Sequence, residues 1–381
     1  MSDDSKRFFI SRIIENLDSQ IRSCTSNSER NILFAQKAFA LARHSFIAES
    51  KQLIRELRSV NPNYEPRLSA WIMFAEGIIE HSDTYDLLKS RDRIIRAHLV
   101  GQAANDPTLA GTAAAWLSDL DFLRGHYKES AEYLEKAFAW SGTQDSEARS
   151  RASMVLGAAM YFGCEPTKAK YWLNVARSHA VHSGDIAMQN IILFNSSALD
   201  VARLTLQDCI GQVDISELQF AVMSAQSVRN LNTALGNSNQ PSMIPVQQAE
   251  LLTIQRKWQE AIDVFDAHIE ALKSQGQSKW APRYLAHRSW CKSNLEDFVG
   301  SRLDSKTALD NIGACTDPDD LSVLHYRIAA AADRCGEPGI AETHRSLGHR
   351  QLAIYTKDQA TVRELFGRIA DLYDPKQKNP A

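Results

Sequence analysis

Several residues and motifs that would identify a class of protein are scarce in this chain. Glycine contributes 17 and proline 11 of the 381 residues, too few for a disordered or fibrous chain. The six cysteines never form a Cys-x-x-Cys pair, and they are too sparse for a disulfide framework or a zinc module. We therefore expect them to be small buried hydrophobic side chains in a reducing cytoplasm.

Long apolar runs and a strong excess of one charge are also missing. No stretch of eighteen apolar residues occurs, and residues 1–7 are polar with no apolar region behind them, so we expect neither a membrane span nor a secretory signal. The net charge is −3, from 43 basic and 46 acidic residues. This balance gives no general reason to expect nucleic acid or an anionic membrane as a partner.

The common catalytic motifs are absent as well: no Gly-x-Gly-x-x-Gly, no phosphate loop and no His-Glu-x-x-His is present. His179 and His182 share one helix face, but a solvated or cross-helix pair is favoured because no carboxylate or cysteine stands beside them at helical spacing. His287 and Cys291 lie one turn apart, in a stretch whose large side chains favour packing over a Cys–His nucleophile. We predict no catalytic residue, no cofactor and no metal.

Helical periodicity, in contrast, runs along the whole chain. Apolar residues recur at steps of four, three and four, as in Tyr127, Ala131, Leu134 and Phe138. Helix breaks such as Asn61-Pro62, Asp106-Pro107 and Asp317-Pro318 separate segments of helical length. The sequence therefore predicts an all-α protein.

A small residue recurs about every 40 positions, one turn into the second helix of each expected helix pair. The clearest instances are Ser130, Ala169, Ala261, Ser301 and Ala341. The intervals are 39, 92, 40 and 40 residues, where 92 equals two intervals of 46 with an extra pair inside, and counting back from Ser130 reaches the region of Lys89 and Glu49. Such a period is typical of helical hairpins that stack on one another.

We therefore predict a right-handed α-solenoid of about eight helical hairpins in place of two or three globular domains. The expected organisation is a lead helix within 1–27, repeats over 28–355, a C-terminal capping helix at 356–373 with an apolar stripe, and a polar tail at 374–381. We expect no output domain after the capping helix, because only a polar tail is seen there.

The repeats resemble the tetratricopeptide (TPR) family. The segment Trp116-Leu117 … Gly125-His126-Tyr127 … Ala131 … Leu134 follows its pattern, and Leu156-Gly157 … Tyr161 … Ala169 … Leu173 matches better. Arg256 stands where the family usually has a turn glycine, and the interval near 40 exceeds the ~34 residues of standard repeats. Longer repeats of this kind are similar to regulatory TPR domains of bacterial signalling proteins and to peptide-sensing regulators.

The resemblance implies that the first helix of each hairpin lines a concave groove that binds a protein or peptide. Projection of the repeats gives nine groove candidates: Asp119, Phe122, Arg151, Met154, Tyr161, Glu250, Arg283, Trp290 and Tyr326. Two asparagines, Asn190 and Asn195, complete the set of eleven. Asn190 and Asn195 interrupt an apolar run, and an amide can bond a peptide backbone with both its donor and its acceptor. The alternative, which we favour for these two, is that they satisfy polar groups of neighbouring helices.

Two other functions stay open at this point. An enzyme or small-molecule sensor would need a site assembled inside the solenoid, with Cys164, His179 and His287 as its members. Self-association through the terminal helices would give a homodimer. The densest basic stretch, Lys89, Arg91, Arg93 and Arg96, is interpreted as a solvated helix face because acidic residues are interspersed and stacking aromatics are missing. The leading hypothesis is a cytoplasmic, non-enzymatic adaptor or regulatory sensor.

Overall fold

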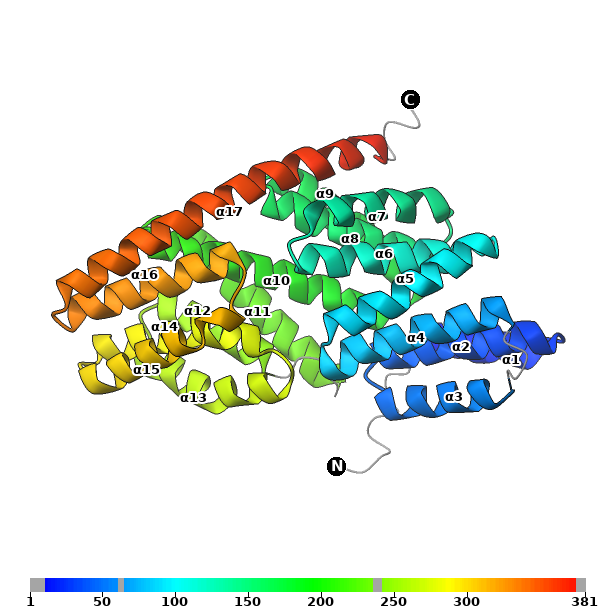
Figure 1. Cartoon of the computed structure of the whole chain (residues 1–381), viewed down its shortest axis with the longest axis horizontal. Coiled ribbons are helices and arrows are strands. Elements are labelled where there is room, and N and C mark those ends of the chain that lie inside the picture. The colour runs from blue at the N-terminus through cyan, green and yellow to red at the C-terminus, as the bar shows by residue number, and fades with distance from the viewer. Residues whose placement is uncertain (1–10, 61–64, 236–241, 375–381) are drawn as a thin grey trace. The chain divides into compact units, whose positions relative to one another are not determined.

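The computed structural model describes residues 11–60, 65–235 and 242–374, which form α-helices, two short 3-10 helices and no strand (Figure 1). The predicted all-α class is confirmed. The seventeen α-helices are α1 Arg12–Ser23, α2 Asn27–Arg43, α3 Ile47–Val60, α4 Pro66–Thr84, α5 Leu87–Ala103, α6 Pro107–Leu123, α7 Tyr127–Trp140, α8 Ser146–Phe162, α9 Pro166–Ser183, α10 Ile186–Cys209, α11 Ile215–Leu235, α12 Met243–Ile254, α13 Trp258–Ser274, α14 Ala281–Asn294, α15 Phe298–Asp310, α16 Pro318–Arg334 and α17 Pro338–Leu372.

After the lead helix α1, the described helices follow one another as eight pairs, from α2 and α3 to α16 and α17. We call the even-numbered member of each pair its first helix and the odd-numbered member its second helix. Several first helices begin at an aspartate whose carboxylate accepts a bond from a free backbone N–H three residues on, as Asp106 does from Leu109 at 3.0 Å. The predicted repeat of helical hairpins is therefore confirmed.

Every one of these eight turns passes through a residue in the left-handed region of φ. The eight residues are Ser45, Tyr85, Gly125, Cys164, Gly211, Arg256, Glu296 and Gly336, with φ between 54° and 76°. Only three are glycine, although the left-handed region is costly for the others. In seven of the eight turns the next N–H bonds back to the end of the first helix, as Lys257 does to Leu252, which satisfies carbonyls that the helix leaves free. Arg256 thus adopts the conformation of the missing turn glycine.

The recurring small residue is buried at the fourth position of seven of the eight second helices. Ser130, Ala169, Ala261, Ser301 and Ala341 are at most 1% exposed. The two earlier positions are Ser50 and Ser90, one residue beyond those reached by counting back, and both are fully buried. Only α11 departs from the pattern, with Leu218 in this place, and the spacing on both sides of that hairpin is longer.

The chain divides into two compact units. Unit 1 comprises Met1–Leu193, Asn232–Asn239 and Thr361–Ala381, and unit 2 comprises Phe194–Leu231 and Gln240–Ala360. In unit 1, an aromatic and aliphatic core lies among α2 to α6, and a second core lies among α6 to α9. The main core of unit 2 lies among α12 to α16 and centres on Phe265, which is fully buried.

The predicted separate capping helix at 356–373 is not found. The single helix α17 runs without a break from Pro338 to Leu372, because no glycine–proline break or turn signal interrupts its helix-forming sequence near residue 356. The part of α17 from Thr361 on belongs to unit 1, where Figure 1 shows it beside α7 and α9. There Val362, Phe366 and Ile369 are buried, so these members of the terminal apolar stripe pack within the chain.

Replacing Ala169 with leucine tests the close packing of the second helices. Ala169 is 1% exposed on α9, in the core shared with α8, and three added carbon atoms should overpack this contact. We expect Ala169→Leu to lower the free energy of unfolding by ~1–3 kcal/mol in chemical denaturation. The control is Ala139→Leu at an exposed position of α7, and equal loss in both variants would contradict the repeat register.

Candidate functional site

All eleven predicted groove residues lie on first helices. They come from α6, α8, α10, α12, α14 and α16, six consecutive first helices. Arg151, Met154, Glu250, Arg283 and Tyr326 are buried, with at most 7% of each residue exposed. The other six are half-buried, and these are Asp119, Phe122, Tyr161, Asn190, Asn195 and Trp290. Their role in ligand binding stays a prediction, and each unit holds its own group of these residues.

In unit 1, the guanidinium of Arg151 lies on the indole ring of Trp116, 3.4 Å from the ring centroid. It also donates to a carboxylate oxygen of Asp119 at 2.5 Å. His81 meets the same indole edge to face, with centroids 5.3 Å apart. Burial, and then the nearby Arg151, lower the pKa of His81 to about 4, so this imidazole is neutral at neutral pH. Three consecutive first helices, α4, α6 and α8, thus meet at one cation–aromatic contact.

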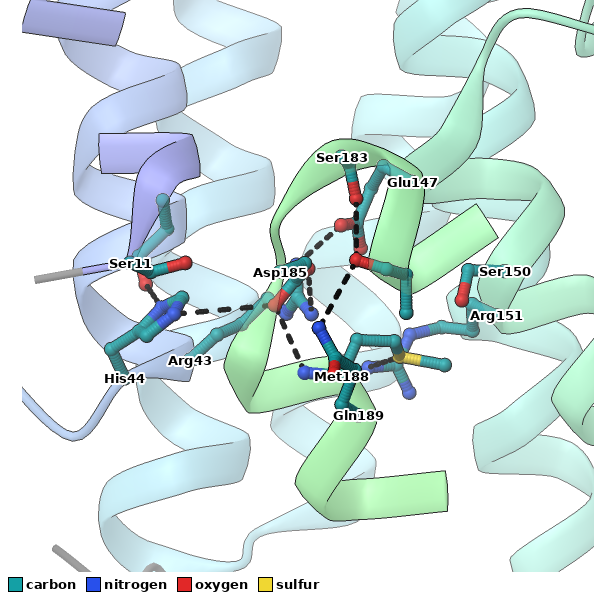
Figure 2. Close-up of polar contacts among 12 residues, drawn as sticks. Ser11, Arg43, His44, Glu147, Ser150, Arg151, Ser183, Asp185, Met188 and Gln189 are labelled. Carbon is teal, nitrogen blue, oxygen red and sulfur yellow. Dashed lines mark hydrogen bonds and ion pairs between the residues drawn. The ribbon is translucent and has the colours of Figure 1, made fainter. Parts of the chain in front are cut away.

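A second group of charges in unit 1 centres on Arg43, at the end of α2 (Figure 2). Its guanidinium donates to Asp185 at 2.6 Å and to Glu147. Asp185 lies between α9 and α10 and also accepts a bond from the backbone N–H of Met188 at 2.9 Å. Ser11 adds a bond to the carbonyl of Gly184 at 2.9 Å. These contacts join the beginning of unit 1 to residues 104 to 173 positions later.

The two carboxylates that Arg43 contacts differ in protonation. Burial raises the pKa of Glu147 to about 7, and Arg43 offsets this only in part. Burial also acts to raise the pKa of Asp185, but the attraction of Arg43 outweighs it and holds this pKa below the ordinary value. One oxygen of Glu147 is buried and has no hydrogen-bond partner among the described residues. Glu147 is therefore poised to hold a proton near neutral pH.

In unit 2, Arg283 is the centre of a buried ionic triad. Its guanidinium donates to Glu250 of α12 and to Asp320 of α16, and all three side chains are at most 7% exposed. A ring nitrogen of His287 lies 3.2 Å from the same Glu250 carboxylate. Burial lowers the pKa of His287 to about 4. The triad links three consecutive first helices, α12, α14 and α16, through buried charges.

A cation–aromatic sandwich lies beside α14 in the same unit. Trp290 has the guanidinium of Arg327 at 4.0 Å and that of Arg256 at 4.9 Å from its ring. Both arginines donate to Asp208 of α10, at 2.7 Å and 2.8 Å respectively. Arg327 and Asp208 are buried, whereas half of the Arg256 side chain is exposed. Arg256 therefore contacts both Trp290 and Asp208, in addition to forming the turn between α12 and α13.

The contacts of Asn190 agree with the alternative favoured from the sequence, in which it satisfies a polar group of a neighbouring helix. Asn190 of α10 and Asn232 of α11 exchange two amide bonds, at 3.2 Å and 3.3 Å. Asn190 therefore satisfies a neighbouring helix in this structure. Asn195 is half-buried on the same helix and belongs to unit 2.

Of the histidines and cysteines singled out in the sequence, His287 and Cys291 are buried, whereas Cys164 is exposed. The thiol of Cys291 contacts the hydroxyl of Thr253 at 3.6 Å, while His287 contacts Glu250. Burial raises the pKa of Cys291 to about 11, so the thiol is protonated at neutral pH. Within residues 11–60, 65–235 and 242–374, no group of three or more His, Cys, Asp or Glu side chains is arranged to hold a metal ion.

The basic stretch of α5 is neutralised by its neighbours. Arg91 forms a two-pronged contact with Asp121 at 2.6 Å and 2.9 Å, and Arg93 bonds Glu76 at 2.6 Å. Lys89 and Arg96 pair with aspartates one turn away on their own helix or its cap.

Among the helices of the described segments, none is long and apolar enough to cross a membrane.

Sequence reasoning missed Arg43, Glu147 and Asp185, and also Asp208 and Arg327. One signal in the sequence identifies other ion pairs, namely opposite charges about one repeat apart on first helices or their caps. Pairs of this kind are Arg67–Asp106, Asp119–Arg151, Glu250–Arg283 and Arg283–Asp320, with separations of 39, 32, 33 and 37 residues. No local spacing indicates the partners of Arg43, which lie 104 and 142 residues away.

Comparisons with known proteins place the chain by its fold. No family model matches the sequence, and no curated protein matches it. Among solved structures, it is similar to a Rap protein complexed with competence and sporulation factor. The TM-score is 0.53 at 12% identity, and the match covers 92% of this chain and 93% of the Rap chain. The chain thus has a TPR-like, all-helical repeat fold.

Replacing Glu147 with glutamine tests the protonation of the Arg43 group. Folding raises the Glu147 pKa from 4.5 to about 7, so the folded chain holds a proton that the unfolded chain releases. This residue therefore costs stability increasingly as pH rises between those values. We expect the melting temperature of Glu147→Gln, relative to wild type, to be higher at pH 8 than at pH 5.

The control is Glu129→Gln at an exposed position of α7, which removes the same charge from the surface. A Glu147→Gln difference that does not change with pH would contradict the raised pKa.

Replacing Arg283 with methionine tests the triad of unit 2. The change leaves two buried carboxylates without their cation, and loss of one partner of a buried ion pair costs ~3–5 kcal/mol. We expect Arg283→Met to lose about that much unfolding free energy at pH 7. Lys273→Met, on the exposed side of α13, should change it by less than about 1 kcal/mol. Similar losses in the two variants would show that the triad does not stabilise the fold.

Proposed function

We propose that this protein is a regulatory sensor or adaptor that binds a peptide or a protein segment along the first helices of its hairpins. The observation that carries the proposal is the fold likeness, over nearly the full length of both chains, to a Rap protein that was solved with competence and sporulation factor. At 12% identity this likeness supports the architecture alone, and the ligand class of this chain is our proposal.

The chemistry of the first helices supports this function. Six of the candidate residues are half-buried, so part of each side chain reaches the surface while the rest is held by neighbours. The set mixes aromatic side chains, amides and a carboxylate, which suits the apolar and polar groups of a peptide. Their supporting partners are ionic and buried, as for Arg151 and Arg283, and this fixes the positions of the helices that carry them.

A non-enzymatic role in the cytoplasm is part of the proposal. The Cys291 thiol is protonated and bonded to Thr253, and His287 is neutral and contacts Glu250, so neither is arranged as a nucleophile and its base. The paired basic residues of α5 favour a protein or peptide partner over nucleic acid.

Obstruction of the first-helix surface of unit 1 tests the function. Ala158 of α8 is half-buried, lies one turn beyond Met154 and shares its helix face, so an arginine there would project over that surface. We expect Ala158→Arg to abolish at least nine-tenths of the binding that immobilised wild-type protein shows toward native host extract. Mass spectrometry identifies the retained proteins and, in a separate run, the retained peptides below about 3 kDa.

The matched control is Ala139→Arg at an exposed position of the second helix α7. Circular dichroism first establishes that both variants are folded. Retention by wild type and Ala139→Arg but not by Ala158→Arg supports binding at the first helices of unit 1. Equal retention by all three proteins excludes this surface, and a non-peptide molecule as the only retained species contradicts the proposed ligand class.

A further inference from the structure

The contact between α16 and the first part of α17, both in unit 2, is close. Gly348 of α17 lies directly against the ring of Tyr326, and a Cβ atom at this glycine would come within 2.9 Å of the ring. Ser322 of α16 donates to the carbonyl of Gly348 at 3.1 Å. Ala341 is fully buried one repeat position after Ser301. Since the backbones approach so closely, any polar group between these helices has little room to move or to be hydrated.

Two histidines face each other within this contact. The Nδ1 atoms of His325 and His344 lie 3.1 Å apart, and their rings stack at 30° with centroids 5.2 Å apart. The residues are 6% and 9% exposed. A bond between two Nδ1 atoms needs one N–H donor and one free lone pair, so at least one of the rings must be neutral. When both rings are charged, two N–H groups point at each other and the bond is lost.

No nearby carboxylate is placed to stabilise a positive charge on the second imidazole ring. Among the described residues, no carboxylate lies within ion-pair distance of either ring, and many of the charged groups on α10, α14, α15, α16 and α17 are paired elsewhere. These pairs are Arg327 with Asp208, Arg283 and His287 with Glu250, Arg288 and Lys292 with Asp304, Arg302 with Glu337, and Arg345 with Asp333 and Glu342.

The second polar bond of this interface also uses a histidine. The hydroxyl of Tyr326 and Nδ1 of His349 lie 2.5 Å apart, one turn along α17 from the stacked pair. His349 is on the exposed side of the helix. Two imidazoles of α17 therefore contact α16, and one of these contacts is buried.

We propose that the stacked pair of His325 and His344 makes the contact between α16 and the first part of α17 sensitive to acid. Neutral imidazoles hold the two helices together, and protonation of both releases residues 338–350 of α17 from α16. This device goes beyond the proposed function and does not depend on which ligand the protein binds.

The direction in which pH changes the stability of this contact follows from the pKa values of the two histidines. Burial, and then His344, lower the pKa of His325 to about 4, and burial lowers the pKa of His344, both from an ordinary value of 6.5. The contact is therefore fully stable above about pH 6.5 and loses stability as pH falls below it. Each histidine makes opening up to about tenfold more favourable per pH unit, so the pair gives up to ~100-fold.

Hydrogen exchange of the full chain tests the proposal. Exchange is followed by mass spectrometry at pH 6.5 and pH 5.5 and corrected for the intrinsic rate at each pH. In wild type we expect the protection of residues 338–350 to fall by about 5- to 30-fold between the two conditions, because the ordinary histidine pKa of 6.5 lies at the upper one. In His325→Asn/His344→Asn, where each amide places a non-titrating polar atom near the former Nδ1, this fall should be at most about threefold.

The matched control is His179→Asn/His182→Asn, which removes two imidazoles from α9 and should behave as wild type. Unchanged wild-type protection at pH 5.5, or an equal fall in wild type and the His325/His344 variant, would overturn the proposal. If that variant does not fold, exchange of the histidine C2–H atoms in wild type decides between the outcomes. Titration of His325 and His344 well below pH 6.5 supports the device, and titration near 6.5 excludes it.

Discussion

The close crossing of the two helices within each hairpin is the constraint on which the rest of the structure depends. It requires a small side chain at the fourth position of the second helix, where Ser50, Ser130 and Ser301 are buried. At three of these crossings, a serine hydroxyl also bonds a main-chain carbonyl of the hairpin, as Ser130 does to Ser118 at 2.8 Å. Larger residues cannot enter these contacts without separating the helices. The exception, Leu218, occurs in the one hairpin whose spacing is longer.

The turns complete this constraint. Each hairpin reverses through one residue in the left-handed region, and five of the eight described turns use a residue other than glycine. The hairpins therefore keep one turn geometry while the sequence varies. At Arg256 this variation adds a function to the turn, since the side chain bonds Asp208 and covers Trp290. A repeat that must keep its backbone geometry can still differ at each turn in the side chain it presents.

The first helices carry charge where a simple repeat protein would carry only apolar residues. Arg151 and Arg283 each bridge to a carboxylate one repeat away, and Arg43 bridges two carboxylates far along the chain. Buried pairs of this kind contribute modest net stability because desolvation offsets much of the attraction, but loss of one partner is costly. They therefore fix which helices lie side by side. The surface proposed for binding is built on these ionic contacts.

The sequence by itself determined the helical class, the hairpin repeat, and the small residues at which helices cross, because each depends on neighbours within about 40 residues. It also placed every candidate residue on a first helix. It did not determine that Arg151 and Arg283 would be buried in ionic contacts, or that Arg43 would meet Asp185. Only the tertiary structure decided the continuous α17 and the stacked pair of His325 and His344. Burial and long-range charge pairing arise from residues that no local period connects, so they exist only once the helices have packed.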